Sequence, residues 1–131
     1  MTPLELIECA KYATKNSYAP FSEFNVGAAL ITKGGKIYKG CNIENSAYSP
    51  SICAERVAIF KAISEGETDF EAMAIVGGRN GVFESFCSPC GVCRQVLFEF
   101  CKDDFKIILG NDTENFVVYG LKDLLPDGFK L

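Results

Sequence analysis

The 131-residue chain contains no histidine at all. That absence excludes Ser–His and Cys–His nucleophilic catalysis and removes every imidazole base. Proton transfer near neutral pH would therefore depend on a carboxyl group whose pKa is shifted by its surroundings. The chain also lacks an apolar run of membrane-spanning length, and its N-terminus has neither a basic start nor an apolar core of the signal-peptide type. These absences predict a cytoplasmic protein with no membrane partner.

Strong positive charge is missing as well. The formal net charge is −4, and the lysines and arginines are scattered along the chain. An acidic balance without a basic cluster disfavours binding to a nucleic-acid backbone. With 48% hydrophobic and 23% charged residues, the chain is typical of a compact protein, and its length predicts a single domain over residues 1–131.

Cysteine, by contrast, is abundant. There are seven cysteines, an odd number that does not suit a disulfide framework in a chain without signs of secretion. Metal ligands together with a few buried thiols explain the count better. Cys9, Cys41 and Cys101 are expected to be small buried hydrophobes without chemistry.

The pattern along the chain alternates between helices and strands. Thr2-Pro3 predicts a helix start with Thr2 as N-cap. The expected strands cover residues 25–32, 36–42, 72–76, 106–109 and 116–119, and the main later helices cover about 53–65 and 89–101. The first two strands should be antiparallel, and the strands after the two later helices should be parallel to each other. We therefore expect an α/β fold, a three-layer α-β-α sandwich around a five-stranded mixed sheet. The last long helix is apolar on more than one side, which favours a subunit interface.

Three cysteines have the spacing of metal ligands. Cys90 and Cys93 open one helix, and Cys53 opens another, so both helix N-termini should direct N–H groups at the same site. Soft thiolate ligands favour zinc. A closed structural site with Cys87 as fourth ligand has compatible spacing. Glu55, two residues after Cys53, favours an open catalytic site instead, because a structural zinc has no use for the acid.

The segments Cys53-Ala54-Glu55 and Pro89-Cys90-Gly91-Val92-Cys93 match the signature of zinc nucleobase deaminases, with cysteine in place of the first histidine. In this all-cysteine version, and in its length, the chain resembles the small homotetrameric cytidine deaminases. Further family-like segments are 24–30, 40–45, 52–56, 88–95 and 124–126.

The resemblance implies hydrolytic, zinc-dependent deamination of cytidine and 2′-deoxycytidine in pyrimidine salvage, with one zinc ion per subunit. Carried over by position, Cys53, Cys90 and Cys93 would bind the metal and Glu55 would shuttle protons. The substrate-binding residues would be Phe24 beside the sugar and base, Asn42 and Glu44 on the ribose 3′-hydroxyl, and the Ala54 backbone on the base. Phe24 is nearly as compatible with a plain core aromatic.

Three further residues take their roles from the resemblance. Tyr48 and Phe129 would complete the pocket of a neighbouring subunit in a homotetramer. Arg56 would donate hydrogen bonds to the ligand sulfurs and offset the negative charge of three thiolates; its plainer reading is a surface arginine. Two rival functions stay open, a deaminase of a modified cytosine nucleoside such as the blasticidin type, and an interaction module held together by zinc.

Overall fold

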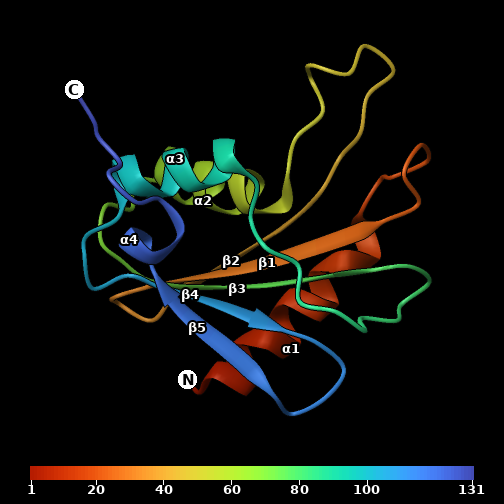
Figure 1. The fold of residues 1–131 in the computed structure, drawn as a ribbon, viewed down its shortest axis with the longest axis horizontal. Helices are drawn as coiled ribbons and strands as arrows, with labels where there is room; N and C mark the ends of the chain where they lie inside the picture. The colour runs from red at the N-terminus through yellow and green to blue at the C-terminus, as the bar shows by residue number, and fades with distance from the viewer.

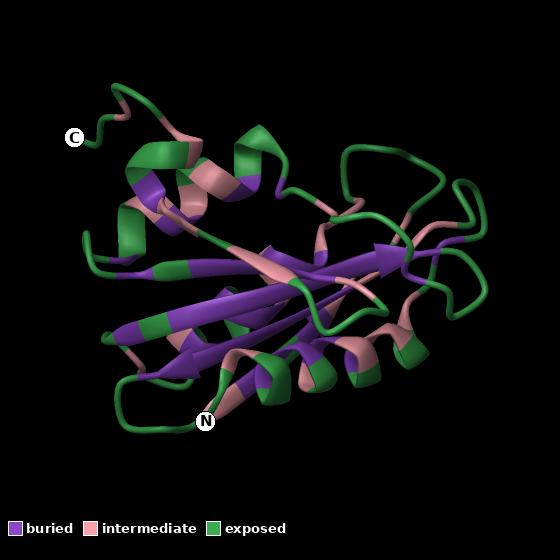
Figure 2. Cartoon of the chain, turned by 60° about the horizontal axis from the view of Figure 1, so that its bottom comes forward, coloured by how far each residue is buried: buried purple, intermediate pink, exposed green.

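The protein, described over all 131 residues by a computed structural model, is a three-layer sandwich with a five-stranded sheet in the middle (Figure 1). Helix α1 covers one face of the sheet, and α2 and α3 lie together on the other (Figures 1 and 2). The predicted fold class is therefore confirmed. The helices are α1 (Pro3–Ala13), α2 (Ala54–Ser64), α3 (Gly91–Phe100) and the short α4 (Leu121–Leu124), with a 3-10 turn at Thr14–Asn16.

The strand order in the sheet is β2-β1-β3-β4-β5. Only β3 and β4 are parallel, and the other three neighbouring pairs are antiparallel. The parallel pair results from the crossover through α3, as expected for a strand–helix–strand unit. The strands are β1 (Asn25–Thr32), β2 (Ile37–Cys41), β3 (Phe70–Gly78), β4 (Lys106–Gly110) and β5 (Phe116–Gly120).

Local sequence signals position the helix starts. The Thr2 hydroxyl accepts a hydrogen bond from the Glu5 N–H, while the Glu5 carboxylate accepts one from the Thr2 N–H, both at 3.2 Å. This reciprocal capping, with Pro3 as the first helical residue, confirms the predicted start of α1. Cys53 and Cys90 are the N-caps of α2 and α3. Two candidate metal ligands are therefore fixed by the way their helices begin.

Two hydrophobic cores pack against opposite faces of the same sheet. The larger core joins the sheet to α2 and α3, and Ile59, Met73 and Phe105 are among its fully buried members. The smaller core joins the sheet to α1 through Leu6 and Ile7. Both sheet faces are covered, and this explains why β3 is an almost continuous apolar run.

Strand β3 is longer than the sequence predicts. Gly77 and Gly78 suggest a strand end, yet they continue β3 and pair with Val26 and Asn25 of β1. Their missing side chains make room for other groups: a Cβ on Gly77 would lie 2.8 Å from the Cys87 sulfur, and one on Gly78 would lie 1.9 Å from the Val82 carbonyl oxygen. The glycines therefore mark a close approach of the following loop rather than a stop.

Candidate functional site

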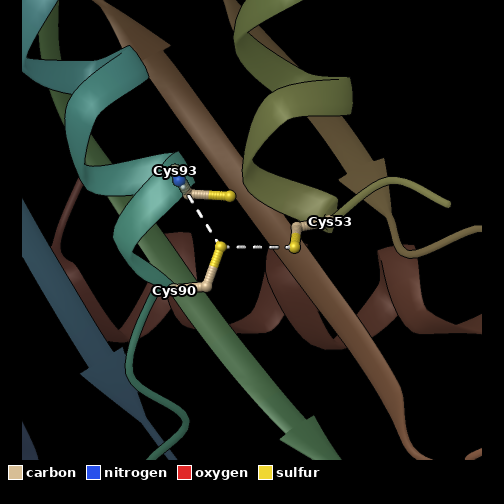
Figure 3. A group of neighbouring side chains, drawn as sticks. All are labelled: Cys53, Cys90 and Cys93. Carbon is tan, nitrogen blue, oxygen red and sulfur yellow. Dashed lines mark hydrogen bonds between the residues drawn. The ribbon is translucent and has the colours of Figure 1, made fainter. Parts of the chain in front are cut away.

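The three candidate ligands converge at the N-termini of α2 and α3. Their sulfur atoms all lie within 4.8 Å of one another, and the Cys53 and Cys90 sulfurs are 3.6 Å apart (Figure 3). The Cys90 sulfur also accepts a hydrogen bond from the Cys93 N–H at 3.4 Å. Cys93 is fully buried, Cys53 is half-buried and Cys90 is exposed. The group therefore reaches from the protein interior to an open cavity.

The electrostatics of the group suit a soft cation. Hydrogen bonding from the Cys93 thiol, with help from Arg56 and Cys90, lowers the pKa of Cys53 to about 5. The same hydrogen bonding, together with burial and the nearby charges of Glu55 and Cys53, raises the pKa of Cys93. Binding of a divalent ion to these three cysteines would release the thiol protons, since metal ligands must be deprotonated. Three sulfurs with one open side fit a tetrahedral zinc that keeps a position free.

Glu55 provides a second sign that the site is incomplete without a ligand. Its side chain is only 3% exposed, and the carboxylate atom Oε1 is buried without any hydrogen-bond partner. Burial raises the pKa of Glu55 to about 7. An orphaned buried carboxyl group is costly, so its retention beside three thiols needs a functional reason.

Arg56 follows Glu55 in the first turn of α2 and contacts the ligand group directly. Its Nη2 atom donates a hydrogen bond to the Cys53 sulfur at 3.5 Å, whereas its Nε is buried without a partner. Arg56 is half-buried rather than on an open helix surface. Its position and its bond to Cys53 favour the tuning role over the plainer surface reading, and the role stays a prediction.

Cys87 does not join the metal group, which consists of Cys53, Cys90 and Cys93 alone. Its sulfur lies above Gly77, which the aromatic ring of Phe24 also approaches. Burial raises the pKa of Cys87 to about 11, which keeps it a neutral thiol. A closed site of four thiolates does not match this arrangement.

A cavity of about 400 Å³ opens beside the sulfurs. Among its lining residues are Asn42, Glu44, Cys53, Glu55, Arg56 and Cys90, which the sequence singled out, together with Cys87. Val26, Ile52 and Ser88, which lie in the family-like segments but have no role assigned from the sequence, also line it, as does Ser51. Phe24 lines an adjoining hollow of about 330 Å³ rather than the cavity itself.

Asn42 and Glu44 hold the loop that leads into β1. Glu44 Oε1 accepts hydrogen bonds from the N–H groups of Phe21 and Ser22, at 2.9 and 3.2 Å, and Oε2 accepts one from the Ser22 hydroxyl. Asn42 Oδ1 accepts from the Val26 N–H and the Ser17 hydroxyl, and Nδ2 donates to the Phe24 carbonyl. Counting donors and acceptors, one N–H of the Asn42 amide and one lone pair of Glu44 Oε2 have no partner within the protein.

The remaining predicted site residues lie elsewhere. Ala54 is fully buried in the first turn of α2. Tyr48 is 80% exposed and Phe129 is 72% exposed, and neither lines the cavity of its own chain. The Phe129 carbonyl accepts a hydrogen bond from Gln95 of α3 at 3.1 Å, which fixes the backbone of the C-terminal segment there. Within one chain, these two aromatic residues have no partner in the site.

A family model described as the cytidine and deoxycytidylate deaminase zinc-binding region matches residues 2–109. The chain belongs to this family. It is 46% identical over 125 residues to a cytidine deaminase of Sporosarcina psychrophila, covering 95% of this chain and 89% of the relative. The crystal structure of a cytidine deaminase from Burkholderia pseudomallei superposes with a TM-score of 0.90 at 44% identity, over 98% of this chain and 100% of the other. A blasticidin-S deaminase of Bacillus cereus is 33% identical over 94% of this chain and 89% of the relative.

Membership of the cytidine and deoxycytidylate deaminase family confirms three sequence predictions, which are the family itself, a zinc-dependent deaminase, and zinc as its cofactor. None of the helices has the length and apolarity needed to span a membrane. The individual roles of the site residues stay predictions.

Proposed function

We propose that this member of the family hydrolyses cytidine and 2′-deoxycytidine to uridine and 2′-deoxyuridine, with release of ammonia. The observation that carries the proposal is the buried, unpartnered carboxyl of Glu55 in a cavity that also holds three thiols. A bound zinc ion supplies the Lewis acid that makes a water molecule nucleophilic at neutral pH. Cys53, Cys90 and Cys93 would hold that ion.

Glu55 performs the proton transfers. Hydrolysis at C4 of the pyrimidine requires a proton taken from the attacking water, its delivery to ring nitrogen N3, and the transfer of the proton of the new C4 hydroxyl to the departing amino group. One carboxyl group serves all three when it can act first as acceptor and then as donor. Burial, which raises the Glu55 pKa to about 7, supports this dual role.

Asn42 and Glu44 bind the sugar. The one N–H left on Asn42 and the one lone pair left on Glu44 Oε2 suit a single hydroxyl group, which accepts from the amide and donates to the carboxylate. The ribose 3′-hydroxyl is such a group, and in a polynucleotide that oxygen carries phosphate instead. Phe24 flanks the sugar and base, and the backbone at Ala54 holds the amide edge of the base.

We further infer that residues 1–131 act as a single domain, in a homotetramer in which Tyr48 and Phe129 complete a neighbouring pocket. The exposure of both aromatic side chains supports this assembly, and so do the exposed Val92 and Phe100 of α3. A cytoplasmic role in pyrimidine salvage, without a nucleic-acid partner, agrees with the acidic balance of the chain.

The deciding experiment follows the ultraviolet absorbance change as cytidine becomes uridine, with zinc content measured in parallel. Glu55→Gln should keep one zinc per chain and lose at least about a thousandfold in turnover, because acid–base catalysis contributes 10²–10⁴-fold per step. Glu71→Gln, an exposed carboxylate far from the cavity, is the matched control and should retain parental turnover.

Three results would contradict the proposal in different ways. If the unmutated protein binds zinc and deaminates blasticidin S but not cytidine or deoxycytidine, its substrates are modified nucleosides. A parent inactive on all three substrates would refute the proposed nucleoside deamination. Full turnover by Glu55→Gln would show that Glu55 is not the proton shuttle.

A further inference from the structure

Ser22 connects the sugar-binding carboxylate to the loop that carries Phe24. The Ser22 hydroxyl donates a hydrogen bond to Glu44 Oε2, and its oxygen Oγ accepts one from the Phe24 N–H at 3.0 Å. The Ser22 N–H adds a third link by donating to Glu44 Oε1. One short side chain thus joins a cavity-lining acid to the backbone two residues further along.

The loop has few other anchors at this point. Apart from the bond from the Glu23 N–H to the Ala19 carbonyl, at 2.9 Å, residues 20–24 are held by side chains of Ser22, Asn42 and Glu44. Glu23 has a positive φ of 58°, which is uncommon outside glycine and needs surrounding contacts to persist. The bonds of Ser22 on both sides of Glu23 provide such contacts.

Occupancy of Oε2 is the critical point. That oxygen has two lone-pair directions, and the Ser22 hydroxyl fills one of them. The carboxylate is then fixed with its remaining lone pair in a single direction. Without the hydroxyl, the group keeps its charge and its bonds at Oε1, but Oε2 is no longer oriented.

We propose that Ser22 is a positioning residue for nucleoside recognition, which acts through Glu44 by leaving one oriented lone pair for the sugar hydroxyl. This inference rests on the proposed function, because it assumes that Glu44 receives a nucleoside. It extends that function by assigning part of sugar recognition to a residue outside the cavity lining.

The test compares Ser22→Ala and Ser22→Thr with the zinc-loaded parent. Hydrogen bonds to charged groups contribute about 1.5–3 kcal/mol, so Ser22→Ala should raise KM for cytidine at least about tenfold while kcat stays within about twofold. Ser22→Thr keeps the hydroxyl on an exposed residue and should restore KM to within about threefold of the parent. Ser64→Ala, a hydroxyl removed at the far end of α2, is the matched control and should change neither constant.

A second substrate separates positioning from general loop damage. With 3′-deoxycytidine the sugar has no hydroxyl for Glu44, so the effect of Ser22→Ala on KM should shrink to less than about threefold. An equal effect on both substrates, an unchanged KM for cytidine, or a Ser22→Thr variant as weak as Ser22→Ala each overturns the proposal.

Uridine binding, followed by calorimetry, distinguishes this proposal from the proposed function. A parent that binds uridine but does not deaminate cytidine refutes the function, and the Ser22→Ala and Ser22→Thr affinities for uridine then decide the role of Ser22 alone. A parent that neither binds nor deaminates nucleosides overturns both.

Discussion

Nη2 of Arg56 lies 3.5 Å from the sulfur of Cys53, one helical turn earlier in the chain. The guanidinium group of Arg56 thus places a positive charge next to one of the three sulfurs. As thiolates, these sulfurs together carry one more negative charge than a divalent ion neutralises. Such hydrogen bonds to ligand atoms tune both the affinity of a metal and its Lewis acidity.

Arg56→Ala should therefore keep the fold and weaken zinc binding by about tenfold or more, in the range found when groups supporting metal ligands are removed. Competition with a chromogenic zinc chelator measures the affinity, and circular dichroism checks the fold. Arg79→Ala, which removes an exposed arginine, is the control. Unchanged zinc retention and unchanged turnover in Arg56→Ala would exclude the tuning role.

Cys87→Ser should retain one zinc per chain, because the Cys87 sulfur lies over Gly77 and outside the ligand group. Cys90→Ser should lose zinc, since two of the three ligands are then left. Metal analysis of the purified variants gives the stoichiometry. If Cys87→Ser lost zinc as fully as Cys90→Ser does, the site would have four thiolates and no catalytic position.

Removal of zinc should lower the thermal stability, since the ion binds the folded state and joins the N-termini of α2 and α3. At a free concentration one hundred times its Kd, a ligand adds about 2.7 kcal/mol, which corresponds to roughly 10 °C in Tm for a domain of this size. Calorimetric scans with and without a chelator, in the presence of a reductant, measure the shift. The Tm of Cys53→Ser should not respond to the chelator.

Gly40→Ala should destabilise the protein by about 1–3 kcal/mol, the usual cost of overpacking. The new Cβ would lie 2.4 Å from the Ala54 carbonyl oxygen and 2.6 Å from the Ala58 nitrogen, both in the backbone of α2. Relief of that clash requires α2 to move, and Cys53 at its N-cap moves with it. Urea unfolding measures the loss, with Gly34→Ala as control because its nearest neighbour atom is 3.8 Å away. Equal stability of the two variants would show that α2 is free to shift.

Mixing two impaired variants, Phe129→Ala and Glu55→Gln, tests whether Phe129 serves a neighbouring subunit. Phe129 is exposed in its own chain, so Phe129→Ala should fold with parental stability but lose at least about tenfold in kcat/KM. Glu55→Gln supplies an intact Phe129 and lacks the proton shuttle. If the pocket is completed in trans, subunit exchange should restore activity above the sum of the two preparations. Activity equal to that sum would place Phe129 outside the neighbouring pocket.

Local signals in the sequence account for most of the fold. Helix α1 begins at a recognisable capping box, and most strands are short apolar runs bounded by turn residues, so the existence and order of the elements follow largely from nearby residues. The convergence of Cys53 with Cys90 and Cys93 is also accessible from sequence, because all three lie at helix starts.

Tertiary contacts account for the rest. Gly77 and Gly78 are strand breakers by propensity, but pairing with β1 and the approach of the following loop overrule that preference. The bonds of Ser22 and Ser17 to Glu44 and Asn42 join residues that are far apart in the chain and follow no periodic pattern. Such contacts become visible only once the loop is folded onto β2 and the residues after it.

The loop between β3 and α3 is fastened near both ends by hydrogen bonds to its backbone, and the Glu84 carbonyl accepts a further one from the Asn111 side chain at 3.4 Å. The Phe83 N–H and carbonyl both bond to Asp112, at 2.6 and 2.9 Å, and the Pro89 carbonyl accepts a hydrogen bond from Arg94 at 2.7 Å. The side chains between them, at residues 84–86, are exposed and border the hollow beside Phe24. Residues 84–86 can therefore be substituted, or the segment lengthened, without moving the cysteine sulfurs at the start of α3. New substrate preferences would arise most easily there, on a metal centre that stays the same.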